Sequence, residues 1–186
     1  MADPDPNRPE PARPAPTTEW RGRFYEDFEI DAVYRHALGR TVLDTDNSWF
    51  TLLTMNTNEL HFNHHYAETQ PFGTPLANST MTLAMVIGLT VSDISQNAVA
   101  NLGMDEVRLT APVFCGDTLY AESVVLDKRE TTSRPYAGIV KVRSRGLNQD
   151  GTEVMSFLRS IMVLKAHSDQ AIQVFPQPET DIRDRP

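Results

Sequence analysis

The chain has 186 residues, of which 40% are hydrophobic and 23% charged, with a formal net charge of −8 at pH 7. This length allows one domain with a proper core. The negative charge argues against nucleic-acid binding, which depends on neutralising phosphates, although a local arginine cluster could still hold an anion. The single cysteine, Cys115, excludes an intrachain disulfide framework.

Both ends of the chain look like tails. Residues 1–18 contain six prolines, and residues 167–186 are again polar and proline-containing. Such segments bury too little apolar area to offset the entropy of ordering them, so we expect one folded domain over residues 19–166. There is no apolar stretch of ~18 residues and no signal-like N-terminus, so we expect a cytoplasmic protein without a membrane partner.

A strand and a short helix are expected first. Residues 34–42 (YRHALGRTV) predict a strand. Residues 46–55 (DNSWFTLLTM) predict a short helix, whose free amides Asp44 or Asp46 can cap.

A longer helix is predicted over residues 79–91 (STMTLAMVIGLTV), with Asn78 or Ser79 as its cap. Its apolar residues leave no polar face of useful width. Because a helix that is apolar all round is a buried one, we expect it at the centre of the domain.

Strand patterns fill the rest of the core, at residues 106–113, 118–130, 138–148 and 153–165. The sequence Asn148-Gln149-Asp150-Gly151 predicts a hairpin turn between the last two. One buried helix followed by long antiparallel strands indicates an α+β fold, in which a curved sheet wraps around the helix.

The segment Met55-Asn56-Thr57-Asn58-Glu59-Leu60-His61-Phe62 carries the expected chemistry. Asn56 and His61 would point to different sides of one helix, because five residues turn through about 500°. They can converge only if the chain leaves the helix between them, and Thr57-Asn58 is a suitable place. Polar groups gathered beside a buried apolar helix indicate a small wet site in a dry core.

Taken together, these segments resemble the MaoC-type (R)-specific enoyl-CoA hydratase/dehydratase family, and most of all its mesaconyl-CoA and itaconyl-CoA hydratase branch. The resemblance covers about residues 22–165. It implies a single hotdog fold. The matching segments are Gly39-Arg40-Thr41-Val42, Asp46-Asn47 with Phe50-Thr51, Met55–Phe62, Pro71-Phe72-Gly73, Pro75-Leu76 with Asn78-Ser79, Asn101-Leu102-Gly103, and Ala111-Pro112-Val113-Phe114 with Gly116-Asp117-Thr118-Leu119.

The family's hydration motif has an aspartate, an Asn-Pro pair, and a histidine five positions after the aspartate. Mapped onto this chain, His61 is the acid and base, Asn58 matches the middle asparagine, and the backbone amide of Ser79 stabilises the enolate oxygen. Two residues depart from the motif: Asn56 replaces the aspartate, and Glu59 replaces the proline. An amide cannot take up a proton, so Asn56 would only orient water and hold the imidazole.

Binding roles rest on less. We expect Asn58, Glu59 and Asn78 to line the substrate site, although Asn78-Ser79 at a helix start is more often a plain cap. Arg134 could meet the phosphates of coenzyme A, but a solvated hairpin end explains it equally well. Arg40 could meet a substrate carboxylate.

The resemblance implies reversible hydration of a 2-enoyl-CoA thioester, short and branched or dicarboxylic. It implies no metal and no cofactor beyond the coenzyme A of the substrate. A homodimer is expected, because a lone hotdog leaves a long sheet edge unpaired. The alternative is a catalytically impaired subunit that binds acyl-CoA or scaffolds an active partner.

Other constellations are weaker. His61, His64 and His65 lack the cysteine or carboxylate spacing of a zinc site. Cys115, between Phe114 and Gly116 at a strand end, fits a buried structural thiol better than a nucleophile.

Overall fold

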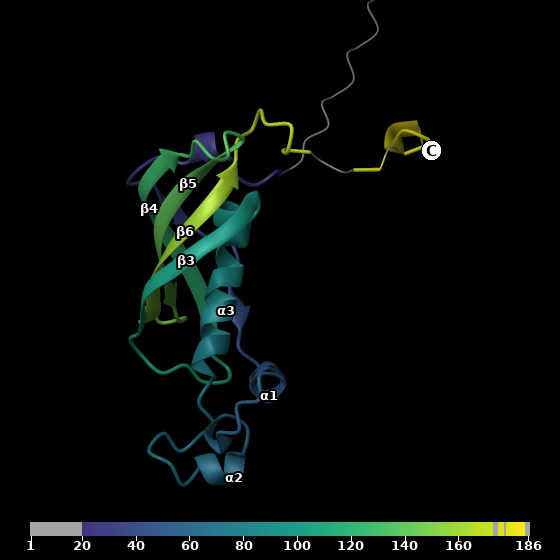
Figure 1. The fold of residues 1–186 in the computed structure, drawn as a ribbon. Coiled ribbons are helices and arrows are strands. Elements are labelled where there is room, and N and C mark those ends of the chain that lie inside the picture. The colour runs from purple at the N-terminus through teal and green to yellow at the C-terminus, as the bar shows by residue number, and fades with distance from the viewer. Residues whose placement is uncertain (1–19, 173–174, 177, 185–186) are drawn as a thin grey trace, which may run out of the picture.

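An antiparallel sheet wrapped around the long helix α3 (Ser79–Thr90) forms the centre of the domain (Figure 1). The computed structural model describes residues 20–172, 175–176 and 178–184. The strands lie in the order β1-β4-β5-β6-β3, and a short strand, β2, also pairs with β4. Their bounds are β1 Val33–Arg35, β2 Arg40–Thr41, β3 Ala98–Leu109, β4 Thr118–Glu130, β5 Ala137–Leu147 and β6 Glu153–Leu164.

The remaining helical elements are short. Helices α1 (Asp44–Leu53) and α2 (His64–Ala67) lie beyond the start of α3, away from the sheet (Figure 1). A π-helical turn over Val91–Ser95 extends α3, and 3-10 turns cover Tyr25–Asp27, Glu59–His61 and Ile182–Asp184. The predicted tail over residues 1–18 lies outside the described residues, and the described part of 167–186 contains only the last of these turns. In the described part of the chain, no helix is long and apolar enough to cross a membrane.

The strong strand predictions are confirmed. Strand β4 has the predicted bounds, and β5 and β6 each differ from prediction by one residue at one or both ends. The turn between them closes as expected, because the side chain of Asn148 accepts hydrogen bonds from the amides of Asp150 and Thr152, and Gly151 takes a positive φ of 78°.

Strand β3 was placed wrongly by its pattern, since it begins at Ala98 rather than at residue 106 and ends at Leu109. It is an edge strand that pairs only with β6, and its register shifts at three places. Bulges break the alternation of apolar and polar residues on which a strand prediction depends.

The single strand expected over residues 34–42 is two short strands, β1 and β2, separated by residues 36–39. At this interruption a Cβ on Gly39 would lie only 2.5 Å from the Tyr120 ring, so the close packing needs glycine. His36 turns inward here. Its Nδ1 lies 3.0 Å from the Asp93 carboxylate and its Nε2 lies 3.0 Å from the Ser123 hydroxyl.

Helix α3 is central, but the prediction that it is buried all round is wrong for the single chain. Its sheet-facing residues Met81, Thr82, Val86 and Thr90 are buried, whereas Leu83, Met85, Ile87 and Leu89 are only partly covered and Ala84 is exposed. The sheet curves around one side of the helix and leaves the other side open. A large exposed apolar face of this kind is typical of a protein–protein or ligand-binding surface.

Candidate active site

The turn that follows α1 presents Asn56. Thr54 caps the helix, Met55 adopts a left-handed conformation with φ 59°, and the amide of Asn56 donates to the carbonyl of Thr51 at 2.9 Å. The amide of Met55 donates to Leu52 at 3.1 Å. This is a Schellman motif, in which the left-handed position is usually glycine. The chain thus turns away from α1 at Met55, two residues before the predicted break at Thr57-Asn58.

The next turn brings His61 back. The side-chain oxygen of Asn56 accepts from the amide of Asn58, and that of Asn58 accepts from the amide of Leu60 at 3.2 Å. Asn58 thus caps the 3-10 turn that carries His61. Glu59, which is exposed, accepts from the side chain of Asn63 at 2.8 Å. Within the described residues, no direct hydrogen bond joins the side chains of Asn56 and His61.

The ring of His61 has a defined orientation. Its Nδ1 lies 2.8 Å from the carbonyl oxygen of Leu76. Because a carbonyl can only accept, Nδ1 must carry a proton, and the neutral ring therefore has its free electron pair on Nε2. This leaves Nε2 ready to take a proton from water.

Asn47 joins the histidine to the start of α3. Its side chain donates to the carbonyls of His61 at 2.7 Å and Leu76 at 3.2 Å, and its oxygen accepts from the amide of Asn78 at 2.8 Å. Asn47 is only 1% exposed, so all three bonds lie out of solvent. Sequence analysis placed Asn47 in the family motif but gave it no role in the site. The sequence carried no signal for this role, because the three bonds join segments that are far apart in the chain.

At the start of α3, the structure distinguishes the residue that caps the helix from the residue whose backbone amide is free. The side chain of Asn78 is 2% exposed and accepts from the amide and hydroxyl of Thr80, while its nitrogen donates to Thr51. Asn78 is therefore the cap. In the part of the chain that the structure describes, nothing accepts a hydrogen bond from the Ser79 amide. This free N–H at a helix N-terminus suits a developing negative charge.

Two cavities flank this helix start. One of about 300 Å³ is lined by Leu76, Ser79 and Thr82 together with apolar residues that follow β3. A second, of about 560 Å³, runs along the open face of α3 and is lined by Leu38, Gly39, Arg40, Asp46, Trp49, Phe50, Leu53, Met81, Met85 and Leu89. Both are mostly apolar, as acyl-binding cavities are.

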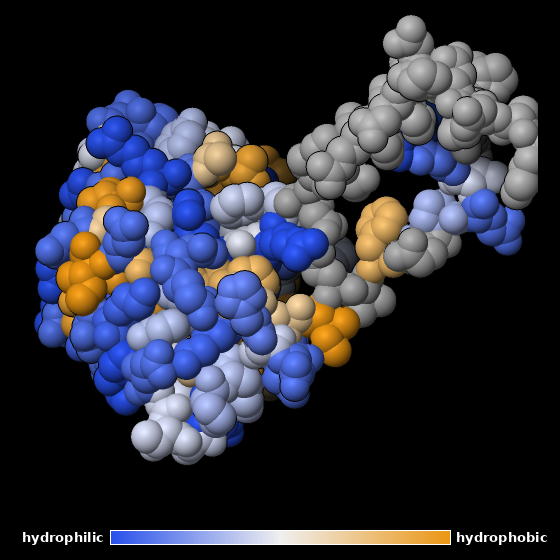
Figure 2. Space-filling model, turned by 90° about the horizontal axis from the view of Figure 1, so that it is seen from above, coloured by the Kyte–Doolittle hydropathy of each residue, from blue (hydrophilic) through white to orange (hydrophobic). Residues whose placement is uncertain are grey.

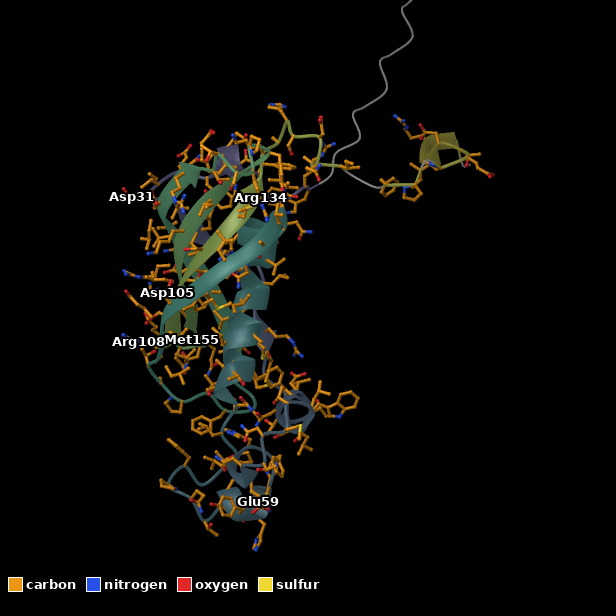
Figure 3. The ribbon with its side chains drawn as sticks, viewed as in Figure 1. Asp31, Glu59, Asp105, Arg108, Arg134 and Met155 are labelled. Carbon is orange, nitrogen blue, oxygen red and sulfur yellow. The ribbon has the colours of Figure 1, made fainter. Side chains whose placement is uncertain are left out.

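The two predicted arginines lie in different places. Arg40 borders the larger cavity, but one of its nitrogens binds both carboxylate oxygens of Asp46, at 3.0 and 2.8 Å. Arg134 lies at the opposite end of the molecule from Glu59 (Figure 3). That end is mostly hydrophilic when seen from above (Figure 2). Within one chain, the fold does not bring Arg134 to the other predicted site residues.

Neither the histidines nor the cysteine makes a second site. His64 and His65 are exposed, and no cluster of three metal-ligating side chains occurs among the described residues. Cys115 is partly buried, and burial, followed by the neighbouring Asp44 carboxylate, raises the pKa of its thiol to about 11. A thiol that keeps its proton is a poor nucleophile.

The chain is similar to known enzymes over most of its length. It is 41% identical to mesaconyl-CoA hydratase of Cereibacter sphaeroides over 144 residues, which is 77% of this chain and 42% of the relative. It is 34% identical to beta-methylmalyl-CoA dehydratase of Chloroflexus aurantiacus over 165 residues, 89% of this chain and 45% of the relative. The chain thus spans about half the length of these relatives.

Solved structures confirm the hotdog fold. A MaoC domain protein dehydratase from Chloroflexus aurantiacus superposes with a TM-score of 0.76 at 33% identity, covering 92% of this chain and 47% of the other. A Mycobacterium tuberculosis protein with a double hotdog fold superposes with a TM-score of 0.72 at 20% identity, covering 88% and 54%. The sequence model of the MaoC-like domain matches residues 27–145. The chain therefore belongs to the family of MaoC-like domains.

Proposed function

We propose that this chain carries the hydration site of an enoyl-CoA hydratase, a carbon–oxygen lyase that works without a metal or cofactor. The observation that carries the proposal is the hydrogen bond from Nδ1 of His61 to the carbonyl of Leu76. It leaves Nε2 of the neutral ring free to act as a base. The accepting residue, Leu76, lies three residues ahead of Ser79, whose backbone amide is free.

The reaction follows from these atoms. Nε2 of His61 takes a proton from water as the water oxygen attacks the β-carbon of the enoyl thioester. The electron pair moves to the thioester oxygen, where the Ser79 amide and the N-terminal end of α3 stabilise the enolate. Nε2–H then returns the proton to the α-carbon. Because one group serves both steps, water adds to a single face of the double bond.

Asn56 orients the water in this scheme. Its oxygen accepts from the amide of Asn58, which fixes the orientation of the side chain. Its NH₂ group donates no hydrogen bond to the described residues and is available to bind the water oxygen. Since an amide takes up no proton, His61 alone supplies the acid–base chemistry. Asn58, Glu59 and Asn78 make contacts that shape the segment, which assigns them to holding the substrate site rather than to the chemistry.

The proposed substrate is a short enoyl-CoA that is branched or dicarboxylic. Support comes from the relatives named mesaconyl-CoA hydratase and beta-methylmalyl-CoA dehydratase. The proposed working unit is a homodimer joined at β3, the longer of the two edge strands of the sheet. This joint would also cover the open face of α3. Arg134 could then meet coenzyme A bound at the partner's site. The cytoplasmic location stays a prediction.

The second candidate is a subunit that binds acyl-CoA without turning it over. Asn56 is the observation that favours it, because the aspartate of the family motif is absent. Loss of one general base often costs ~10²–10⁴-fold in rate.

A hydration panel separates the two. Purified protein is mixed with crotonyl-CoA, mesaconyl-CoA and itaconyl-CoA, and loss of the enoyl-thioester absorbance is followed. Turnover that disappears in His61→Ala, with the fold intact by circular dichroism, supports the hydratase. Binding of the thioesters with no turnover supports the binding subunit, and unchanged turnover in His61→Ala would remove the site assignment.

Asn56→Asp tests the unusual residue. A faster enzyme would mean that the native site lacks a useful base. A slower one would mean that the site is built around the amide.

A further inference from the structure

Arg159 is a buried guanidinium without an acidic partner. The residue is only 6% exposed, and burial lowers the pKa of its side chain. Its Nε donates to the side-chain oxygen of Asn101 at 3.2 Å, and one terminal nitrogen donates to the hydroxyl of Thr90 at 3.4 Å. Both partners are neutral, and among the described residues no carboxylate lies within ion-pairing distance of Arg159.

Burying a guanidinium without a negatively charged partner is energetically unfavourable. An arginine has five donor N–H groups and is always charged, and a buried charge is normally paired. Among the described residues, protein hydrogen bonds engage two of the three guanidinium nitrogens, and the third is not fully enclosed. A negative group from outside the chain can therefore reach it.

The side chain lies where an outside group could reach it. Arg159 pairs with Met104 of β3 and shares the sheet face that carries the buried Val142. Of its two hydrogen-bond partners, Thr90 is the last residue of α3 and Asn101 lies on the edge strand β3. Arg159 thus sits beneath the end of α3, one strand in from the edge at which a second copy would join.

Symmetry determines what a second copy would bring there. A two-fold axis perpendicular to the joined sheet runs the two β3 strands antiparallel and reverses every element lying across the sheet. The two α3 helices then run in opposite directions. In the proposed homodimer, the Ser79 end of one copy would face the Thr90 end of the other, on the side where Arg159 lies.

Among the described residues, α3 and β3 of a second copy offer no suitable acidic side chain at this joint. Helix α3 contains no acidic residue, and Asp93 just after it is already bound to His36 and Arg23. Of the acids on β3, Asp105 pairs with Leu158 on the outer sheet face, and Glu106 lines a hollow on that same face with Arg108. Figure 3 shows Asp105 and Arg108 at the edge of the molecule away from α3.

The site in the same chain is too distant to supply the negative group. Thr90 follows Ser79 by eleven residues along α3, a rise of about 16 Å, which a four- or five-carbon acyl chain does not span. The group must come from across the joint.

We propose that Arg159 of one protomer binds the free carboxylate of a dicarboxylic acyl thioester held at the Ser79 end of the other protomer. The inference rests on the proposed function for the location of the thioester. It makes Arg159 a specificity-determining residue: the forked guanidinium selects an acyl group that ends in a carboxylate and gives no advantage to one that ends in a methyl group.

Binding is measured first, because it does not depend on turnover. Succinyl-CoA and butyryl-CoA have the same four-carbon chain and differ in the terminal carboxylate. Calorimetry on the full chain is expected to show succinyl-CoA bound roughly 10- to 100-fold tighter. Arg159→Met is expected to abolish this difference and leave butyryl-CoA binding unchanged. Arg159→Lys keeps the charge without the fork and should retain a small part of the preference.

Arg143→Met is the matched control. Arg143 lies on neighbouring β5, is exposed, and lines the hollow on the outer face of the sheet. Its loss should leave the succinyl-CoA preference intact. The proposal is overturned if wild-type protein shows no preference, if the preference survives in Arg159→Met, or if that variant weakens both thioesters equally. Dissociation of the Arg159→Met dimer in ultracentrifugation would place the counter-charge in the partner protein and overturn the ligand assignment.

Mixed dimers test the placement across the joint. Co-expressed His61→Ala and Arg159→Met chains form a dimer in which one site has both residues intact, and this dimer is expected to recover up to half of wild-type turnover of mesaconyl-CoA. No recovery would overturn the placement. If wild-type protein prefers succinyl-CoA through Arg159 but hydrates no thioester, the carboxylate site stands and the proposed hydratase function fails.

Discussion

The side-chain nitrogen of Asn47 donates to the backbone carbonyl of His61 at 2.7 Å, while its oxygen accepts from the amide of Asn78 at the start of α3. One buried amide therefore sets the distance between the proposed base and the helix that would stabilise the enolate. Loss of this positioning is expected to lower the reaction rate more than the stability of the fold, because small displacements from a reactive geometry slow a reaction strongly.

Asn47→Asp is expected to lower turnover at least tenfold and to lower the free energy of unfolding by about 1–3 kcal/mol. A carboxylate cannot donate to the two carbonyls and leaves them unsatisfied in a buried place. Asn148→Asp is the matched control. Among the described residues, the side chain of Asn148 only accepts hydrogen bonds, and a carboxylate accepts them equally well. Equal effects of the two changes on urea denaturation and turnover would contradict the role of Asn47.

Met55→Gly is expected to leave stability unchanged or raise it by up to about 1 kcal/mol, because the left-handed conformation costs a residue with a Cβ about 1–2 kcal/mol. Met55→Val should lower stability and also turnover, since a β-branched residue resists this conformation and redirects Asn56. Urea denaturation and the hydration assay measure both.

Leu53→Gly provides the comparison for Met55→Gly. Leu53 is 82% exposed and lies in the last turn of α1, where its backbone is helical. Glycine there should cost about 1 kcal/mol. If glycine destabilises equally at residues 53 and 55, the left-handed backbone at Met55 carries no strain.

Much of the fold was readable from the sequence because strong local signals agreed with tertiary packing. The alternation in residues 118–130 predicted strand β4, and the turn residues Asn148 and Gly151 predicted the hairpin between β5 and β6. The interruption at Gly39 was hidden, because it depends on the ring of Tyr120 from a distant strand. Strand β3 was hidden too, since its bulges erase the period of two.

The candidate site was readable only in part. His61 and Ser79 were predicted from a motif, and the structure gives His61 a defined tautomer and Ser79 a free amide. The role of Asn47 could not be predicted, because its three bonds join segments up to 31 positions apart. The burial of Arg159 could not be predicted from the sequence either, because it arises from the packing of β6 against the end of α3.

Cys115 is expected to react slowly with iodoacetamide. With a pKa of about 11, raised mainly by burial, only about one thiol in a thousand is a thiolate at pH 8, so alkylation should be a few-hundredfold slower than for a free cysteine. The rate should keep rising with pH up to about 11. Asp44→Asn should speed it, because the neighbouring carboxylate also raises the pKa; a rate that levels off near pH 8.5 would contradict the assignment.

Glu122→Gln is expected to reduce stability by up to about 1 kcal/mol at pH 7, because Glu122 accepts from Arg145 at 2.8 and 2.6 Å and from Arg35 at 3.3 Å. The hydrogen bonds from Arg145, the largest cause, lower the pKa of Glu122. A lowered folded pKa means that the stabilisation is fully present above the unfolded value near ~4.3 and is lost as pH falls through the folded value. The difference between wild type and variant in urea denaturation should therefore shrink below pH 4. Glu130→Gln is the control, because the Glu130 side chain is 72% exposed, and its stability should differ little from that of the wild type at any pH. If the effect of Glu122→Gln persists in strong acid, the effect arises from packing instead of charge.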